Sequence, residues 1–298
     1  MSVVNGDRGA VYDRGYRPYD GPRGRRGAAT LALFKASMRR ALGIRRSWRQ
    51  KVAPFVLLGV VTIPAVVNVG IGYVTRDRID KLEIITYRDY VGVSSALLLF
   101  VALVAPDVMC PDRRQRVLPL MFARPLTGID YVVAKVGAIA SILFAFSFLP
   151  QVVLFLGNML VSDSASNYFT GHLDILWRVP VTVFFLALYY AVIGVAIGSM
   201  TDRRIVAGAG VIGLLLVTSI ASGILVGDVQ PGNGSIAALI NILSVPLYLR
   251  DLVFLGHIDR ESRLTSVGNG GLLAVVTYLV VVLVGVGVLL RRYRWVER

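Results

Sequence analysis

Residues that bind metals or act as nucleophiles are scarce in this chain. Among 298 residues there is one cysteine, Cys110, and there are two histidines, His172 and His257. A single cysteine excludes an internal disulfide. Neither histidine belongs to an H-E-x-x-H pattern, and both fall in predicted loops. We therefore expect no metal site, no catalytic residue and ordinary structural roles for these three side chains.

A nucleotide-binding loop of the Walker A type is also missing. That loop needs Gly-Lys before Ser or Thr, because backbone amides and the lysine together hold the phosphates. No lysine of this chain follows a glycine; the lysines are Lys35, Lys51, Lys81 and Lys135. The chain cannot hydrolyse ATP by that route, and we expect it not to be an enzyme by itself.

Charged residues are few, and apolar residues are abundant. Hydrophobic residues make up 55% of the chain and charged residues only 17%. This composition is more apolar than that of a typical soluble domain. Six apolar runs, each about 19 to 26 residues long, can cover the roughly 30 Å of bilayer hydrocarbon as helices. They are Val52 to Val74, Val91 to Met109, Val136 to Val161, Val179 to Met200, Ile205 to Val226 and Leu272 to Leu290. The sequence predicts an all-α membrane protein with six transmembrane helices.

The position of the positive charges predicts the orientation. The net charge is +14, and 24 of the 32 Lys and Arg residues lie in the segments 1 to 51, 111 to 135, 201 to 204 and 291 to 298. With six spans these segments share one side, which the positive-inside rule makes cytoplasmic. We therefore expect a multi-pass protein of the cell membrane with both termini in the cytoplasm. Charge placed in this way argues against nucleic acid as a partner.

Two segments precede the first span. Residues 1–27 are rich in Gly, Tyr and Arg without apolar periodicity, so we expect a disordered basic tail rather than a signal peptide. From Ala28 to Trp48 apolar and basic residues alternate at helical spacing, with Phe34, Arg39 and Arg40 among them. This pattern predicts an amphipathic helix in the inner interface, within a segment 28–50. Residues 51–298 form the predicted transmembrane domain.

The loop between the second and third spans carries the main candidate site. Its first half, Arg113 to Ala123, combines basic and apolar residues and can form about three turns of helix. Pro125 then ends the helix, because the residue before a proline is pushed out of helical conformation. We expect this helix to contact a soluble partner through Arg113, Arg114, Arg116, Leu118, Leu120, Met121, Phe122 and Pro125. The alternative interpretation is an ordinary basic cytoplasmic loop.

The stretch RVLPLMFARPLTGIDYVVAK resembles the corresponding loop of ABC-2 type permeases, the membrane subunits of one class of ATP-binding-cassette exporters. The matching positions include Leu118, Leu120, Met121, Phe122, Pro125, Thr127, Tyr131, Val132, Val133 and Lys135. Arg116 and Pro119 stand where the family usually has Gly and Glu. The resemblance implies a cytoplasmic coupling helix here, an interfacial helix before the first span and short re-entrant helices before the last.

The segment before the last span fits that expectation. Ile236 to Gly256 is apolar, but it is broken at Ser244-Val245-Pro246 and carries Arg250 and Asp251. A seventh span would put the basic C-terminus outside, against the charge rule. We therefore expect a broken helical pair that enters the membrane from the outside.

Polar and small residues inside the spans are the remaining candidates. Asn68, Gln151, Asn158, Tyr189 and Tyr190 would be costly in contact with lipid. They are either part of a translocation path or contacts between helices. The glycines Gly194, Gly198, Gly208, Gly210 and Gly213 allow close packing, either in a dimer or within the chain.

The resemblance implies that the chain is the permease subunit of an ABC exporter. Its partners would be separate ATPase subunits, which hold the ATP and Mg, a second permease copy or a related permease, and membrane lipid. No cofactor is expected on this chain. An ATP-independent channel or scaffold is the alternative.

Overall fold

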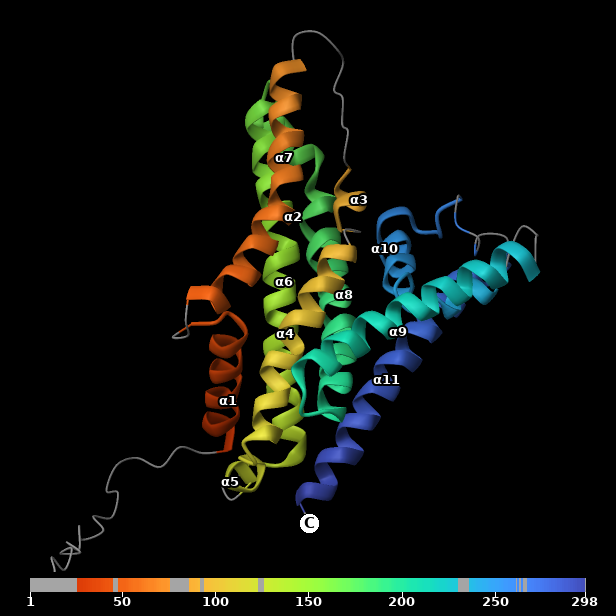
Figure 1. Cartoon of the computed structure of the whole chain (residues 1–298). Helices are drawn as coiled ribbons and strands as arrows, with labels where there is room; N and C mark the ends of the chain where they lie inside the picture. Colours follow the sequence, from red (N-terminus) through yellow and green to blue (C-terminus); the bar gives the residue numbers. More distant parts are fainter. Residues whose placement is uncertain are drawn as a thin grey trace, which may run out of the picture.

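The computed structural model describes residues 26–44, 48–75, 86–91, 94–122, 126–229, 236–260, 262, 264 and 267–297 (Figure 1). Every regular element in these ranges is helical. The long helices are α1 (Arg26–Ala41), α2 (Trp48–Thr75), α4 (Ser94–Arg114), α6 (Gly128–Val161), α8 (Leu173–Met200), α9 (Arg204–Ile224), α10 (Val245–Leu255) and α11 (Gly270–Glu297). The short ones are α3 (Tyr87–Val91), α5 (Leu118–Phe122), α7 (Ala165–Gly171), the π-helical turn η1 (Leu225–Val229) and the 3₁₀ turn η2 (Ile236–Ile240).

Helix α8 is the centre of the bundle. It packs against α4, α6, α9, α10 and α11, and 72% of its apolar window is buried, compared with 11% for α2 at the edge. Small residues make this central position possible. A Cβ atom on Gly194 would lie 2.5 Å from Val101 Cγ1 of α4, so only glycine lets the two helices approach this closely.

In the part of the chain that the structure describes, five helices are long and apolar enough to cross a bilayer, namely α2, α6, α8, α9 and α11. They correspond to five of the six predicted runs, so the chain is a helical multi-pass membrane protein by the length and composition of its helices. The other run, Val91 to Met109, supplies most of α4. This helix is apolar in its middle, but it contains Asp107 and ends on Asp112-Arg113-Arg114, and it is not among the five.

The predicted interfacial helix ends earlier than expected. We predicted a helix from Ala28 to Trp48, whereas α1 stops at Ala41. Gly43 has a φ of 65°, and its N–H donates to Arg40 O at 3.1 Å while Ile44 N–H donates to Arg39 O at 2.9 Å. These two bonds form a Schellman motif, which glycine in the left-handed region stabilises. Gly43 is the residue in the sequence that marks this helix end.

The segment before α11 is broken as predicted. The turn η2 ends at Ile240, and α10 begins at Val245 with Pro246 in its first turn. Gly256 ends α10 with a φ of 75°. The break falls at residues 241–244, slightly before the predicted position, because Pro246 is tolerated in a first turn and not inside a helix.

The helical bundle is elongated between two ends, and one long helix, α9, diverges from the others (Figure 1). Helix α5 and the C-terminal end of α11 lie together at one end, at the bottom of the view. Helix α9 leaves the other long helices obliquely (Figure 1), and it contacts η1 and η2. The predicted tail, residues 1–27, lies outside the described residues except for Arg26 and Gly27.

Candidate functional site

The predicted coupling helix is two elements rather than one. Helix α4 continues to Arg114, and α5 begins at Leu118. Between them Arg116 has a φ of 50°, and its N–H donates to Arg113 O at 3.0 Å while Val117 N–H donates to Asp112 O at 3.2 Å. This is a second Schellman motif, with arginine where glycine is usual. The prediction of one helix over Arg113 to Ala123 was wrong. Pro119 has no N–H for a helical bond to residue 115 and its ring would clash there.

The break divides the predicted docking residues into two groups. Arg114 and Arg116 are exposed and Arg113 is half-buried. Leu118, Met121 and Phe122 are half-buried and pack against the main apolar core. The Phe122 ring lies 6.0 Å from the ring of Tyr131, which in turn lies 4.7 Å from that of Tyr293 on α11. The apolar side of α5 therefore anchors it to its own bundle. Pro125 and the side chain of Leu120 lie outside the described residues.

A buried ionic cluster is connected to α5 through Tyr131, whose ring packs against Phe122 and whose hydroxyl binds Asp112. Asp112, in the last turn of α4, is fully buried. Its carboxylate accepts a hydrogen bond from Arg40 of α1, binds Lys135 Nζ of α6 at 2.5 Å, and accepts the Tyr131 hydroxyl at 3.0 Å. Lys135 Nζ also donates to Val108 O at 3.1 Å. One carboxylate thus links three helices.

The charge state of this cluster follows from its partners. Burial alone would raise the pKa of Asp112, but Lys135 and Arg40 outweigh burial and hold the pKa below its ordinary value of 3.8. The carboxylate is therefore charged at neutral pH between two cations. Sequence reasoning placed Lys135 at the membrane edge and did not use Asp112. A lysine inside the run VVAKVGAIA was the available signal, since such a charge needs a partner.

Helix α1 is fixed to the bundle at three points. Arg26 Nε donates to Asp130 Oδ2 at 2.7 Å at the start of α6, and Thr127 and Asp130 form the capping box of that helix. The ring of Phe34 faces Gly137, where a Cβ would lie 3.6 Å from it. Arg40 makes the third contact through Asp112, while Arg39 is exposed. Helix α1 therefore packs against α6 and α4.

The candidates for a translocation path fall into groups that bind different elements. Gln151 Nε2 donates to Tyr87 O at 3.2 Å, and Asn158 Nδ2 donates to Tyr87 Oη at 3.3 Å, so these two hold α3. The hydroxyls of Tyr189 and Tyr190 each donate at 2.9 Å to the broken segment, at Ile242 O and Leu243 O respectively. Asn68 is buried on α2. Four of these side chains thus bind backbone or side-chain oxygens of neighbouring elements.

A second ionic cluster, at the other end, was not predicted. Arg88 of α3 binds Asp251 of α10 at 2.9 Å and also binds Asp259. Arg250 Nη2 lies 2.8 Å from the same Asp251 carboxylate. Burial lowers the pKa of Arg88, but the two aspartates raise it above its ordinary value. Arg250 and Asp251 had been noted as charges in an apolar segment; Arg88, 162 positions from Arg250, carried no signal.

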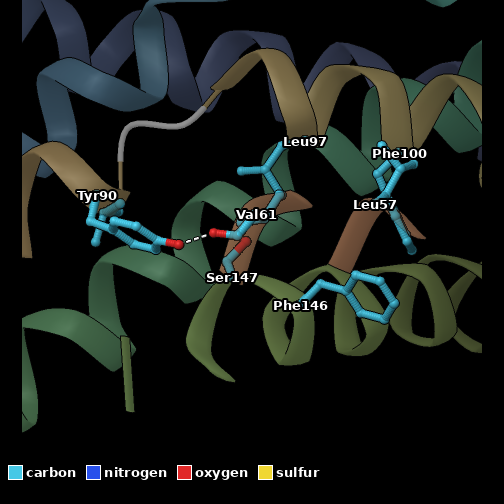
Figure 2. Close-up of a pocket in the computed structure, with 8 residues that line it drawn as sticks. Leu57, Val61, Tyr90, Leu97, Phe100, Phe146 and Ser147 are labelled. Carbon is cyan, nitrogen blue, oxygen red and sulfur yellow. Dashed lines mark hydrogen bonds between the residues drawn. The ribbon is translucent and has the colours of Figure 1, made fainter. Parts of the chain in front are cut away.

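An apolar pocket opens between α2, α4 and α6 (Figure 2). Leu57, Leu97, Phe100 and Phe146 line it, and Tyr90 closes one side by donating its hydroxyl to Val61 O. Its volume of about 20 Å³ has room for about one water molecule. The pocket is too small to hold a substrate.

Within the described residues, no three His, Cys, Asp or Glu side chains converge in a way that could hold a metal ion. His172 Nδ1 lies 2.8 Å from Tyr168 O, and its ring stacks on the Tyr168 ring at 4.1 Å. His257 Nδ1 lies 2.9 Å from Ile258 O. Both histidines thus have local backbone partners.

No family model matches this chain, and no curated protein shows significant similarity to it. The resemblance to ABC-2 type permeases therefore rests on the residues quoted for it in the sequence.

Proposed function

We propose that this chain is the membrane subunit of an ABC-2 type exporter in the cell membrane. Two separate ATPase subunits would hold the ATP and Mg, and a second permease copy or a related permease would complete the assembly. Helix α4 would supply the sixth span, and both termini would face the cytoplasm. Helix α5 would serve as the coupling helix, and η2 with α10 as the re-entrant pair.

The buried Asp112 cluster is the observation that carries this proposal. It joins α1, α4 and α6 at the end of the molecule where α5 lies. Its Lys135–Asp112 ion pair is enclosed, so solvent does not screen this pair as it screens exposed pairs. A force applied to α5 would therefore move three long helices together, which is what a rigid-body transport mechanism needs.

The exposed side of the α4–α5 connection is the proposed contact for the ATPase. Arg114 and Arg116 are exposed there, and the short α5 is held from behind by its apolar side chains. Two exposed arginines beside the anchored α5 favour binding to an acidic surface of the partner. Exposed charges mainly guide association and select the partner.

At the opposite end, the Arg88 cluster ties α3 to α10, and Tyr189 and Tyr190 hold the break before α10. We assign these contacts to the closed outer side of the transport path.

Copurification tests the proposal. The chain is expressed together with the genes that flank it, purified in mild detergent, and examined for a copurifying subunit that contains a Walker A motif. In the variant Arg114→Glu/Arg116→Glu we expect retention of that subunit to fall by at least tenfold, about 1.4 kcal/mol. The matched control is Arg291→Glu/Arg294→Glu, which removes the same charge from exposed positions of α11 at the same end.

Equal retention by the two double variants would reject the docking role of the α4–α5 connection. A native complex with no ATPase subunit would reject the exporter proposal itself and favour an ATP-independent channel or scaffold.

A further inference from the structure

The broken segment formed by η2 and α10 is held from two sides by different kinds of contact. On the side of α8 and α9 the contacts are neutral hydrogen bonds to its backbone. The hydroxyls of Tyr189 and Tyr190 bind carbonyl oxygens at the break, and Ser222 of α9 donates to Ala237 O at 3.0 Å. All three donors are buried. Breaking these bonds would leave enclosed polar groups unpaired, which is costly.

On the side of α3 the contacts are ionic and within reach of water. Helices α3 and α10 are in contact (Figure 1). Arg88 Nε binds Asp251 at 2.9 Å, and Arg88 also binds Asp259. The side chains of Arg88 and Asp259 are 21% and 29% exposed. Charged groups that solvent can reach exchange a protein partner for water at a small net cost. The contacts to α3 are therefore easier to break than the buried bonds to α8 and α9.

Helix α10 carries its own counter-charge for Asp251. Arg250 donates from Nε and Nη2 to one Asp251 oxygen, at 2.9 and 2.8 Å. Asp251 is only 4% exposed, and a buried carboxylate without a cation is strongly unfavourable. Because Arg250 lies on the same helix, Asp251 stays paired if α10 separates from Arg88. A permanent tie needs only Arg88, whereas a reversible one needs Arg250 as well.

We propose that Arg88 and Asp251 form a reversible latch, and that α10 separates from α3 while it stays bound to α8. Arg178 of α8 supports this direction of movement, because its Nη1 donates to Phe254 O at 3.2 Å and ties the far end of α10 to α8. The structure shows the latch closed. The inference rests on the proposed assignment of this end to the closed outer side of the transport path, and opening of the latch does not require the ATPase.

The test follows two distances by EPR spectroscopy of spin-labelled, full-length protein in detergent. The pair Asp89→Cys/Leu255→Cys reports the distance between α3 and α10. The pair Leu176→Cys/Leu255→Cys reports the distance between α8 and α10. All three positions are exposed, whereas Cys110 is buried and should take up little label.

Arg88→Gln removes the latch, and Arg260→Gln is the matched control, because it removes an exposed arginine next to Asp259. We expect Arg88→Gln to raise the ratio of long to short α3–α10 distances about fivefold, the upper value for an exposed ion pair. The α8–α10 distance should not change. Salt at about 1 M should raise the same ratio in the protein with Arg88 and not in Arg88→Gln, because it screens ion pairs.

An unchanged α3–α10 distance in Arg88→Gln, or an equal change in Arg260→Gln, would overturn the latch. A longer α8–α10 distance would also overturn it, since α10 would then leave α8. Thermal unfolding shows whether each variant is folded, and the salt titration tests the latch without replacing Arg88. A native complex without an ATPase would reject the exporter proposal and would leave these distances interpretable.

Discussion

At the scale of single residues, two helices end with the same left-handed backbone conformation at different residue types. Gly43 ends α1 and Arg116 ends α4, and both lie in the left-handed region, at φ 65° and 50°. Glycine adopts this conformation without penalty, whereas a side chain there costs about 1 to 2 kcal/mol. Arg116 is thus a strained residue at the proposed ATPase contact.

The strain at Arg116 leads to a stability prediction. Arg116→Gly should relieve the left-handed penalty but should also add backbone freedom to the unfolded chain, worth about 0.5 to 1 kcal/mol. We expect a net stabilisation of about 0.5 to 1 kcal/mol, measured as a higher Tm in detergent, while Gly43→Ala should lower the Tm. A lower Tm for Arg116→Gly would mean that the arginine side chain makes a contact that compensates for its backbone.

The second residue-scale prediction concerns Asp112. Asp112→Asn leaves Lys135 and Arg40 without their buried counter-charge, so we expect a loss of about 3 to 5 kcal/mol at pH 7. Asp130→Asn is the control: Asp130 is 16% exposed and its partner Arg26 is 56% exposed, so solvent screening should limit its loss to about 1 kcal/mol.

The pH dependence of Asp112 has a defined sign. Its pKa is lowered in the folded protein by Lys135 and Arg40, against the effect of burial. Its stabilising contribution is therefore complete above the ordinary value of 3.8 and is lost as the pH falls through the lower, folded value. Unfolding of wild type and Asp112→Asn should differ at pH 7 and converge as the pH falls below about 4. A constant difference over this range would contradict the charged state of the carboxylate.

At the scale of helices, glycines decide how close α4, α8 and α9 lie. A Cβ on Gly208 would lie 2.7 Å from the backbone oxygen of Ala102, and one on Gly194 would lie 2.9 Å from Ala105 Cβ. Backbone atoms of a packed helix cannot move aside easily. The two interpretations that the sequence left open are thus resolved for Gly194, Gly198 and Gly208, which face α4 of the same chain.

Gly208 and Gly213 form a matched pair for a test. Gly208→Ala should lower the Tm, because a methyl group cannot fit against Ala102, whereas Gly213 has nothing within 4 Å. Gly213→Ala should be neutral or stabilising by up to about 1 kcal/mol through helix propensity. Tm values in detergent check both. If Gly213→Ala is the damaging one of the two, that side of α9 is an interface between chains.

At the scale of the whole molecule, the number of spans can be measured directly. Cys110 is buried, with 1% of its surface exposed, so the wild-type chain should label weakly and serve as the background. Asp89 and Gln115 are exposed near the two ends of α4. If α4 crosses the membrane, a membrane-impermeant maleimide should label Asp89→Cys on intact cells and Gln115→Cys only after permeabilisation. Labelling of both on intact cells would place α4 outside the bilayer.

The sequence alone determined the helices and their approximate extents. Long apolar runs can satisfy their backbone hydrogen bonds in lipid only as helices, so α2, α6, α8, α9 and α11 follow from composition, and Pro246 fixes the position of the break before α10. These features depend on residues close together in the chain, which is why periodicity and turn residues predict them.

Tertiary structure decided which charges and polar groups meet. Arg40, Asp112 and Lys135 come from three helices, and Arg88 and Asp251 from segments far apart in sequence; no local pattern encodes such pairs. The position of α5 also depended on packing, since the ring of Phe122 lies against that of Tyr131. Burial makes each of these contacts strong, and burial is a property of the assembled bundle.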